Sequence, residues 1–373
     1  MCREAETDTK ALLVAHCQTY PLAQISDLLK LLHQRVFWCG HLVEDEAAAL
    51  KRLREEAQAL PPEEGGPLCE EIGGGVCRLH LRVLGQSSLS LETLGRFFLA
   101  TAAESPGSAG AFEEKANILI GLCEDGTLPF SSAEAVRALE ESRAGGHPAQ
   151  RHSQPFRAGY APAYRVVKKV FCDFLPLFCR IDALAKGGRR VRVAIDGKSG
   201  AGKSTLAALL GSVYGCNVFS MDDFFLPAGE KTAERLSQPG GNVSYERFAQ
   251  EVLTPLESGD SFAYRAYCCR TQTMSEPVAV SPNPVSIVEG VYSLHPHLSR
   301  FYEVRVFLSV SGEAQRRRLL ARSPGLYDRF VREWIPLEET YFDALEIAAQ
   351  CDFIFCSDAD GEYTLKGGHK CGL

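Results

Sequence analysis

The 373-residue chain lacks the features of a secreted or membrane protein. Its first ten residues, MCREAETDTK, contain no apolar signal segment, and no run reaches the roughly 18 apolar residues that a membrane span needs. The 14 cysteines are scattered and include no Cys-x-x-Cys pair, so the pattern predicts neither a zinc site nor a redox dithiol. We therefore expect a cytoplasmic protein with reduced thiols and no membrane partner.

The chain also lacks an excess of positive charge. Its 47 acidic residues outnumber 40 basic ones, giving a formal net charge of −7, which argues against a protein that mainly binds nucleic acid. Residues 151–169, RHSQPFRAGYAPAYRVVKK, do mix basic and aromatic side chains, as some nucleic-acid-binding segments do. The prolines and the acidic background favour an interdomain packing segment instead. The sequence leaves the oligomeric state open.

The length and composition of the chain indicate two domains, because 373 residues of which 45% are hydrophobic suffice to form two hydrophobic cores. Residues 1–160 are interpreted as a mainly helical α+β domain of unassigned role. Apolar residues recur at helical spacing over 25–36, and residues 77–83 alternate like a half-buried strand. Ser131 and Glu134 have the spacing of a capping box at the start of a helix. Further helices are expected at 45–60, 90–102 and 111–122, and a connecting helix at 161–187.

Three histidines of this first domain, His41, His147 and His152, are isolated in the sequence. No cluster of acids or cysteines beside them completes a set of metal ligands. We therefore interpret them as structural or surface histidines.

Residues 188–373 alternate short apolar runs with helical patterns. The runs have the length of strands and lie at 191–195, 217–221, 284–288 and 304–310. Such alternation predicts a parallel sheet with helices on both faces. The fold class expected here is therefore α/β.

A phosphate-binding motif follows the first of these strands. The residues Gly197, Lys198, Ser199, Gly200, Ala201, Gly202, Lys203 and Ser204 fit G-x-x-x-x-G-K-[ST] without a mismatch. Glycines allow successive backbone N–H groups to turn toward phosphate oxygens, and the helix N-terminus adds partial positive charge. Lys203 is placed to reach the β- and γ-phosphates and Ser204 to ligate Mg²⁺, with Thr205 next in the helix. The motif predicts a P-loop NTPase-type domain that binds ATP, or another nucleoside triphosphate, with Mg²⁺.

Three classes of protein share this motif. A GTPase carries an Asn/Thr-Lys-x-Asp motif, and the chain has none. A transporter-type ATPase carries a signature near LSGGQ, which residues 311–315, SGEAQ, match only faintly. A small-molecule kinase needs a base near the γ-phosphate, a partner for magnesium and a mobile arginine-rich lid. The chain offers candidates for all three, so a kinase is favoured.

Acidic residues follow two of the expected strands. Asp222 and Asp223 come just after residues 217–221, at the sheet edge where ligands of doubly wound folds lie. A carboxylate there can accept the proton of an acceptor hydroxyl as it attacks the γ-phosphate, so one of the two is a candidate base. Glu289 directly follows the run at 284–288, where an acid can hold Mg²⁺ or orient the nucleophile.

An arginine-rich segment supplies the candidate lid. Residues 314–334 contain six arginines, and Ser323-Pro324-Gly325 interrupts the helix between them, as a hinged flap requires. Arginines on a closing lid neutralise the charge of phosphoryl transfer. The favoured candidates are Arg322 and Arg329, with Arg318 on the same helix face as Arg322.

These segments together carry a family resemblance. VAIDGKSGAGKST, MDDFF, IVEGVY and the arginine-rich segment resemble the uridine kinase and phosphoribulokinase family of P-loop kinases, over about residues 188–358. The resemblance implies that Asp222 is the base that takes the proton of the acceptor. It also implies that Glu289 is the acid at the strand end and that Arg318, Arg322 and Arg329 belong to the lid.

The acceptor is less defined. Uridine kinases carry a His-Pro-Asp-like segment that binds ribose hydroxyls, whereas residues 237–248 read SQPGGNVSYERF. The histidine of their base-reading segment has no counterpart in residues 263–273, AYRAYCCRTQT. Two arginines in this segment would suit an anionic or sugar-like acceptor. The candidate acceptor contacts are Asp223, Tyr264, Arg265, Tyr267 and Arg270.

The sequence thus predicts an ATP-dependent small-molecule kinase that phosphorylates a hydroxyl of a nucleoside-like or sugar-like acceptor. Lys203, Asp222 and Arg322 are its candidate catalytic residues, and Ser204 and Glu289 its candidate magnesium ligands. The alternative is an ATP-binding switch, in which closure of the lid controls a first domain that binds a partner.

Overall fold

The computed structural model describes residues 2–40, 43, 45–61, 65–104, 107–358 and 361–368, with His41 outside these ranges. The chain forms two compact units, Met1–Cys172 and Asp173–Leu373. Each unit is described by itself. Within the described ranges no helix combines the length and the apolar character required to cross a membrane.

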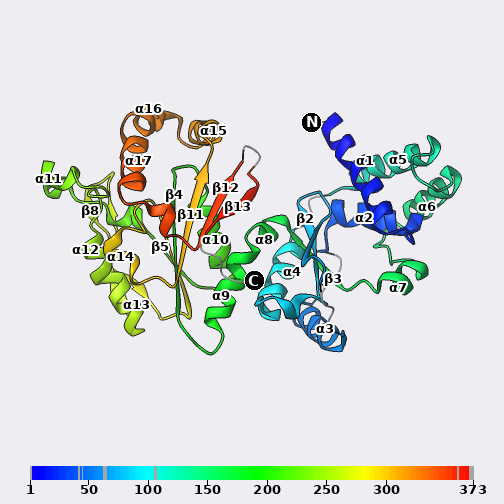
Figure 1. Cartoon of the computed structure of the whole chain (residues 1–373), viewed down its shortest axis with the longest axis horizontal. Helices are drawn as coiled ribbons and strands as arrows, with labels where there is room; N and C mark the ends of the chain where they lie inside the picture. Colours follow the sequence, from blue (N-terminus) through cyan, green and yellow to red (C-terminus); the bar gives the residue numbers. More distant parts are fainter. Residues whose placement is uncertain are drawn as a thin grey trace. The chain divides into compact units, whose positions relative to one another are not determined.

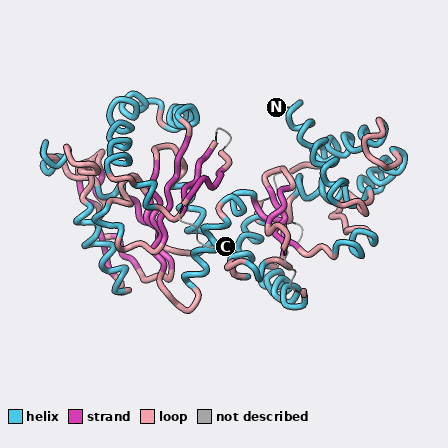
Figure 2. Tube along the Cα trace, in the orientation of Figure 1, coloured by secondary structure: helices cyan, strands magenta, loops and turns pink. Residues whose placement is uncertain are grey.

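The first unit places helices around a small antiparallel sheet, as Figure 2 shows in cyan and magenta. The sheet has the order β1 (Cys69–Glu71), β2 (Val76–His80) and β3 (Tyr164–Lys168). Apolar side chains of α2, α5 and α6 form the core with Val76 and Val166. The helices are α1 (Cys2–Thr19), α2 (Ile25–Phe37), α3 (Glu46–Ala59), α4 (Leu91–Ala102), α5 (Ala109–Glu124), α6 (Ser132–Ala144) and α7 (Gln154–Tyr160).

Two expectations for this part of the chain differ from the structure. Residues 161–187 do not form one connecting helix but β3, α8 (Lys169–Asp173) and α9 (Leu175–Ala185). The β-branched pair Val166 and Val167 pairs with β2 and is buried, so burial in the sheet outweighs helical continuity. The capping box also does not form, because the Ser131 side chain makes no hydrogen bond at the start of α6.

The second unit is built on a six-stranded sheet, and its α/β class confirms the prediction. Five strands are parallel, in the order β12, β11, β4, β10 and β5, and β13 is antiparallel to β12 at one edge. The strands are β4 (Val191–Gly197), β5 (Asn217–Ser220), β10 (Val285–Glu289), β11 (Val304–Val310), β12 (Phe353–Ser357) and β13 (Tyr363–Gly367). Figure 2 shows these strands between layers of helix.

The helices of this unit follow the strands in alternation. After β4 comes α10 (Lys203–Tyr214), and after β5 the short turn Met221–Phe224. The expected helix at 245–256 is α12 (Tyr245–Phe248), a π-helical turn (Ala249–Leu253) and α13 (Thr254–Ser258). After β11 come α15 (Gly312–Arg322), α16 (Tyr327–Arg329) and α17 (Ile335–Ala344), which Figure 1 shows in succession.

Candidate active site

The phosphate-binding motif forms a tight turn between β4 and α10. Gly197, Gly200 and Gly202 have φ angles of 137°, 76° and 100°, which side chains rarely adopt. A Cβ at Gly197 would lie 2.0 Å from the Leu308 carbonyl oxygen of neighbouring β11. The glycines therefore permit both the curl of the loop and its close approach to the sheet. The last turn residue, Gly202, leads directly into α10, so the loop lies at a helix N-terminus.

Lys203 is folded back over this loop. Its Nζ donates to the Gly197 oxygen at 2.7 Å and to the Lys198 oxygen at 3.1 Å, and its side chain is buried. Ala201 is fully buried, and its carbonyl accepts from the Tyr363 hydroxyl at 3.2 Å. The ammonium is thus fixed against the loop, where it would meet a phosphate bound by the backbone N–H groups. Thr205 is exposed.

Ser204 and Glu289 meet beside the loop. The Ser204 hydroxyl donates to Glu289 Oε2 at 3.2 Å, and the Ser220 hydroxyl donates to Oε1 at 3.1 Å. Burial raises the pKa of Glu289, which Lys203 opposes and Asp222 reinforces. A hydroxyl and a carboxylate are oxygen ligands of the kind that Mg²⁺ prefers, so this pair fits a magnesium ion carried by a bound nucleotide.

Asp222 and Asp223 follow β5 at the same sheet edge. Glu289 and Ser220 are partners in the parallel pairing of β10 and β5, which brings Asp222 into electrostatic range of Glu289. The Asp222 side chain is exposed, and its backbone N–H donates to the Ser220 hydroxyl at 3.3 Å. Asp223 is half-buried, and its pKa is raised by burial and by Asp222. The structure therefore brings the candidate base and the candidate metal ligands together.

The lid arginines differ from one another. Arg318 donates to the Gly200 oxygen at 3.1 Å and to the Ser357 hydroxyl at 2.7 Å, so it joins the phosphate loop to β12. Arg322 is exposed and lies 5.7 Å from the centre of the Phe330 ring. Arg329 is also exposed and pairs with Glu333 at 3.2 Å. Arg318 is thus engaged in supporting the loop, whereas Arg322 and Arg329 lie at the surface of the candidate lid.

The candidate acceptor contacts differ in their burial. Tyr264 on β6 (Phe262–Tyr264) is part of the apolar core and lies 5.7 Å from the rings of Phe219 and Phe224. Tyr267 on β7 (Tyr267–Cys268) is buried, whereas Arg265 and Arg270 are exposed. Burial and the nearby Asp223 raise the pKa of Tyr264. Two of the set are thus linked to Asp223. Tyr264 interacts with it electrostatically, and Arg247 donates both to the Asp223 carbonyl at 3.0 Å and to the Arg265 carbonyl at 2.7 Å.

Two acidic residues that the sequence analysis did not select hold the site together. Asp196 is the second-last residue of β4 and is fully buried. It accepts from the Gly197 N–H at 2.7 Å, the Leu294 N–H at 3.0 Å and the Tyr341 hydroxyl at 2.9 Å. Burial raises its pKa to about 6 despite these hydrogen bonds. Its place directly before the motif was the only signal in the sequence.

Glu338 of α17 is the second of these acids. It accepts the Ser199 N–H at 3.0 Å and the Ser199 hydroxyl. Burial raises its pKa. Gln315 of α15 donates to the Ser199 oxygen at 2.8 Å, and Lys198 pairs with Glu339 at 2.8 Å. Residues of α15 and α17 therefore bond directly to the phosphate loop, which no motif in the sequence indicated.

Tyr292 is a further residue outside the predicted set. It is buried just after β10 and has a φ of 78°, which is unusual for an aromatic residue. Burial raises the pKa of its hydroxyl, as do the charges of Glu338, Asp196 and Asp222. Strained backbone of this kind concentrates at functional sites, so Tyr292 joins the candidate set.

Comparison with known proteins was made for both sequence and structure. No family model matches the chain, and no curated protein matches it. Solved structures of P-loop kinases do match about half of it. A structure described as a possible uridine kinase from Bacillus stearothermophilus is 21% identical, with a TM-score of 0.36, covering 48% of this chain and 98% of that one.

Two further solved structures extend the likeness to other kinases. D-glycerate 3-kinase from Cryptococcus neoformans is 14% identical, with a TM-score of 0.40, over 53% of this chain and 98% of its own. Shikimate kinase from Bacteroides thetaiotaomicron is 18% identical, with a TM-score of 0.23, over 46% of this chain and 86% of its own. At these scores, the α/β assignment rests on the strand order and loop geometry of the chain itself.

Proposed function

We propose that the second unit is an ATP-dependent kinase that transfers the γ-phosphate of Mg·ATP to a hydroxyl of a small nucleoside-like or sugar-like molecule. The observation that carries this proposal is the cluster at the sheet edge. Ser204 hydrogen-bonds Glu289 beside the phosphate loop, and the exposed Asp222 lies within their electrostatic range. A nucleotide-binding loop alone needs no such exposed carboxylate, whereas a kinase needs a base there.

The proposed roles follow from these positions. The N–H groups of residues 198–202 and Lys203 bind the phosphates, and Ser204 and Glu289 supply oxygen ligands for magnesium. Bound magnesium would neutralise charge on the phosphates during transfer. Asp222 orients the acceptor hydroxyl and takes its proton onto a carboxylate oxygen. The acceptor oxygen attacks the γ-phosphorus as the bond between that phosphorus and the β–γ bridging oxygen breaks, and ADP leaves. Arg322 and Arg329 offset the negative charge and exclude water when the lid closes.

An ATP-dependent switch is the second candidate. The hydrogen bonds between the candidate lid helices and the phosphate loop favour it. Gln315, Arg318 and Glu338 all bond to Ser199 or Gly200 of the phosphate loop. Nucleotide binding at the loop would therefore alter contacts that position α15 and α17. In a switch this movement is itself the output, and no acceptor is needed.

The experiment measures ATP consumption by the full chain with Mg²⁺ against nucleosides, sugars, sugar phosphates and vitamin precursors. A kinase gives consumption that depends on one class of acceptor, and Lys203→Met abolishes it. An exposed lysine of the same unit supplies the matched control, since Lys231→Met should leave consumption unchanged. Slow consumption that is indifferent to every acceptor would contradict the kinase and support the switch.

A further inference from the structure

Three cysteines of the first unit meet on one face of its small sheet. Cys69 begins β1, Cys77 is the second residue of β2, and Cys172 lies in α8. In the pairing of β1 with β2, Cys69 lies opposite Leu79 and Cys77 lies opposite Glu71, so the two cysteines share a face of the sheet. No spacing in the sequence indicated this cluster, because Cys172 is 103 positions from Cys69.

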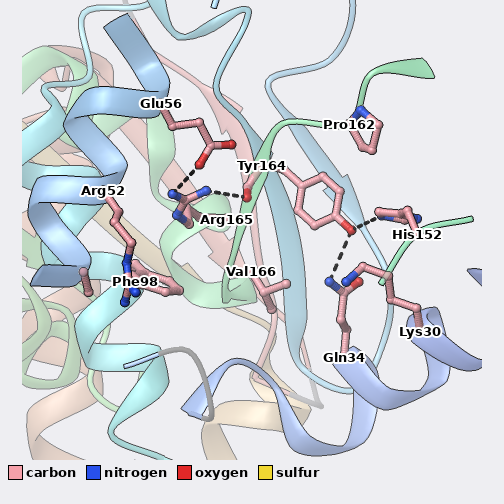
Figure 3. Close-up of a pocket in the computed structure, with 11 residues that line it drawn as sticks. Lys30, Gln34, Arg52, Glu56, Phe98, His152, Pro162, Tyr164, Arg165 and Val166 are labelled. Carbon is pink, nitrogen blue, oxygen red and sulfur yellow. Dashed lines mark hydrogen bonds and ion pairs between the residues drawn. The ribbon is translucent and has the colours of Figure 1, made fainter. Parts of the chain in front are cut away.

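The pairing of β3 with β2 brings the third cysteine to the cluster. β3, which forms one wall of the cavity in Figure 3, pairs with β2 over its whole length. α8 follows β3 directly, and the Lys169 N–H at its start donates to the Gly75 oxygen, just before β2, at 2.8 Å. The helix therefore begins beside β2, and the Sγ atom of Cys172 reaches that of Cys69 on β1, at 2.6 Å.

The contact between these two thiols is close enough for a covalent bond to form with little movement. A disulfide bond measures about 2.05 Å, so the two sulfurs lie only slightly farther apart than bonded ones. Cys69, Cys77 and Cys172 are all free thiols in the structure. Cys69 and Cys172 are half-buried, whereas Cys77 is buried. The pair that can both bond and meet a small reagent is therefore Cys69 and Cys172.

The surroundings of the two thiols assign them different roles. Hydrogen bonding with Cys69 and Cys77 raises the pKa of Cys172, and burial raises it further, so Cys172 keeps its proton. The thiolate is the nucleophilic form of a cysteine, so Cys172 is not the thiol that attacks first. Cys69 lies on β1, an edge strand of the sheet, and is half-buried. It is the thiol that a small reagent meets first.

We propose that Cys69 and Cys172 form a reversible disulfide by exchange with a low-molecular-weight disulfide. The Cys69 sulfur, having lost its proton to water, attacks one sulfur of the small disulfide, whose S–S bond breaks as the new bond forms. One small thiolate leaves and takes up a proton. Cys172 then attacks the Cys69 sulfur, and its proton passes to the second small thiolate as that group leaves. Two protein thiols are oxidised, and one small disulfide is reduced to two thiols.

The proposed bond would join β1 to α8, at the end of the first unit. Disulfides of proteins in reducing compartments are usually transient, so we expect excess small thiol to break this one. Its population would then follow the ratio of small disulfide to small thiol around the protein. The site involves no residue of the phosphate loop, and it does not depend on the proposed kinase activity.

The test is oxidation of the full chain by glutathione disulfide. Cys268→Ser and Cys269→Ser first remove two exposed thiols that would also react. After oxidation, N-ethylmaleimide blocks the remaining thiols, and mass spectrometry identifies joined peptides without reduction. We expect a peptide pair joined through Cys69 and Cys172, which excess glutathione separates again.

A second pair of thiols in the first unit supplies the matched control. Cys17 is half-buried, Cys123 is buried, and the two interact electrostatically. A bond between them should form at least tenfold more slowly than the bond between Cys69 and Cys172. In denaturant this preference should disappear, because the fold alone brings Cys69 and Cys172 together.

Variants separate the two steps of the exchange. Cys172→Ser should leave Cys69 joined to one glutathione, because the second attack is lost. Cys69→Ser should slow the oxidation of Cys172 at least tenfold, because the first attack is lost.

Three results would overturn the proposal. They are no joined peptide pair at millimolar glutathione disulfide, a bond from Cys172 to Cys77 in place of Cys69, and formation no faster than that of the control pair. All three are measured with the first unit unchanged, so they decide the matter even if Cys172→Ser or Cys69→Ser does not fold.

Discussion

Three buried acids near the phosphate loop have pKa values that burial raises and a nearby lysine lowers. Asp196, Glu289 and Glu338 are all buried, and burial raises the pKa of each. Lys203 opposes the rise in all three, and its ammonium is therefore the common counter-charge of the cluster. Groups whose pKa values are perturbed by burial and a specific partner are concentrated at functional sites.

The raised pKa of Asp196 should make the free energy of unfolding depend on pH. Its folded-state pKa of about 6 lies above the ordinary value, so the folded state holds the proton more tightly than the unfolded state. The stability contributed by Asp196 is therefore present below pH 4 and is lost as the pH rises to about 6. We expect the loss to be about 3 kcal/mol, and Asp196→Asn to remove it.

Urea unfolding of the wild type and Asp196→Asn between pH 4 and 7 checks this prediction. The difference in the free energy of unfolding should shift in favour of the variant as the pH rises. Parallel curves for the two proteins would contradict it.

At the scale of elements, the phosphate loop depends on the pairing of β4 with β11. Gly197 is the register partner of Leu308, and the Lys198 N–H donates to the Leu308 oxygen at 3.0 Å. This approach leaves no space for a side chain at Gly197. The loop is thus formed by the sheet as well as by its own glycines.

Gly197→Ala should destabilise the second unit by about 3 kcal/mol. The added Cβ meets backbone rather than a flexible side chain, and the φ of 137° is strained for alanine. Gly229→Ala is the control, because no atom lies within 4 Å of its added Cβ, and it should change stability by less than about 0.5 kcal/mol. Chemical denaturation measures both, and equal effects would show that the close approach does not matter.

A substitution in the candidate lid should change the rate of phosphoryl transfer without changing the free energy of unfolding. Arg322 ends α15, is exposed and lies 5.7 Å from the centre of the Phe330 ring. Arg322→Gln should therefore leave the free energy of unfolding within about 0.5 kcal/mol. It should slow phosphoryl transfer about a hundredfold, because a lid arginine offsets charge mainly in the transition state. Single-turnover kinetics beside the exposed Arg317→Gln test this, and equal rates for the two variants would exclude Arg322 from the lid chemistry.

At the scale of the whole molecule, local patterns predicted more than long-range ones. The strand at 191–195, the glycine motif and the helix from Lys203 are consecutive in the sequence, so their geometry followed from it. Glu289 and Asp222 were placed at one edge because parallel strands share a direction. The hydrogen bond from Ser199 to Glu338 joins residues that are 139 positions apart, and no nearby sequence pattern indicates it.

The candidate acceptor residues also could not be placed from local sequence patterns alone. Tyr264 has the composition of a binding residue, yet it packs against Phe219 in the core, since β6 and β9 (Val278–Val280) pair beside the main sheet. The break of residues 161–187 into a strand and two helices likewise depends on pairing with the distant β2. Contacts of this kind are decided by packing, which a single sequence does not display.

The central claim is that Asp222 serves as the base for phosphoryl transfer from ATP bound at the phosphate loop. The most direct measurement is single-turnover transfer of labelled γ-phosphate to the acceptor found by the consumption assay, with nucleotide affinity measured in parallel. Asp222→Asn should slow transfer by about a thousandfold and leave affinity within about twofold. The exposed Glu230→Gln should change neither. Transfer at the same rate in wild type and Asp222→Asn would contradict the account.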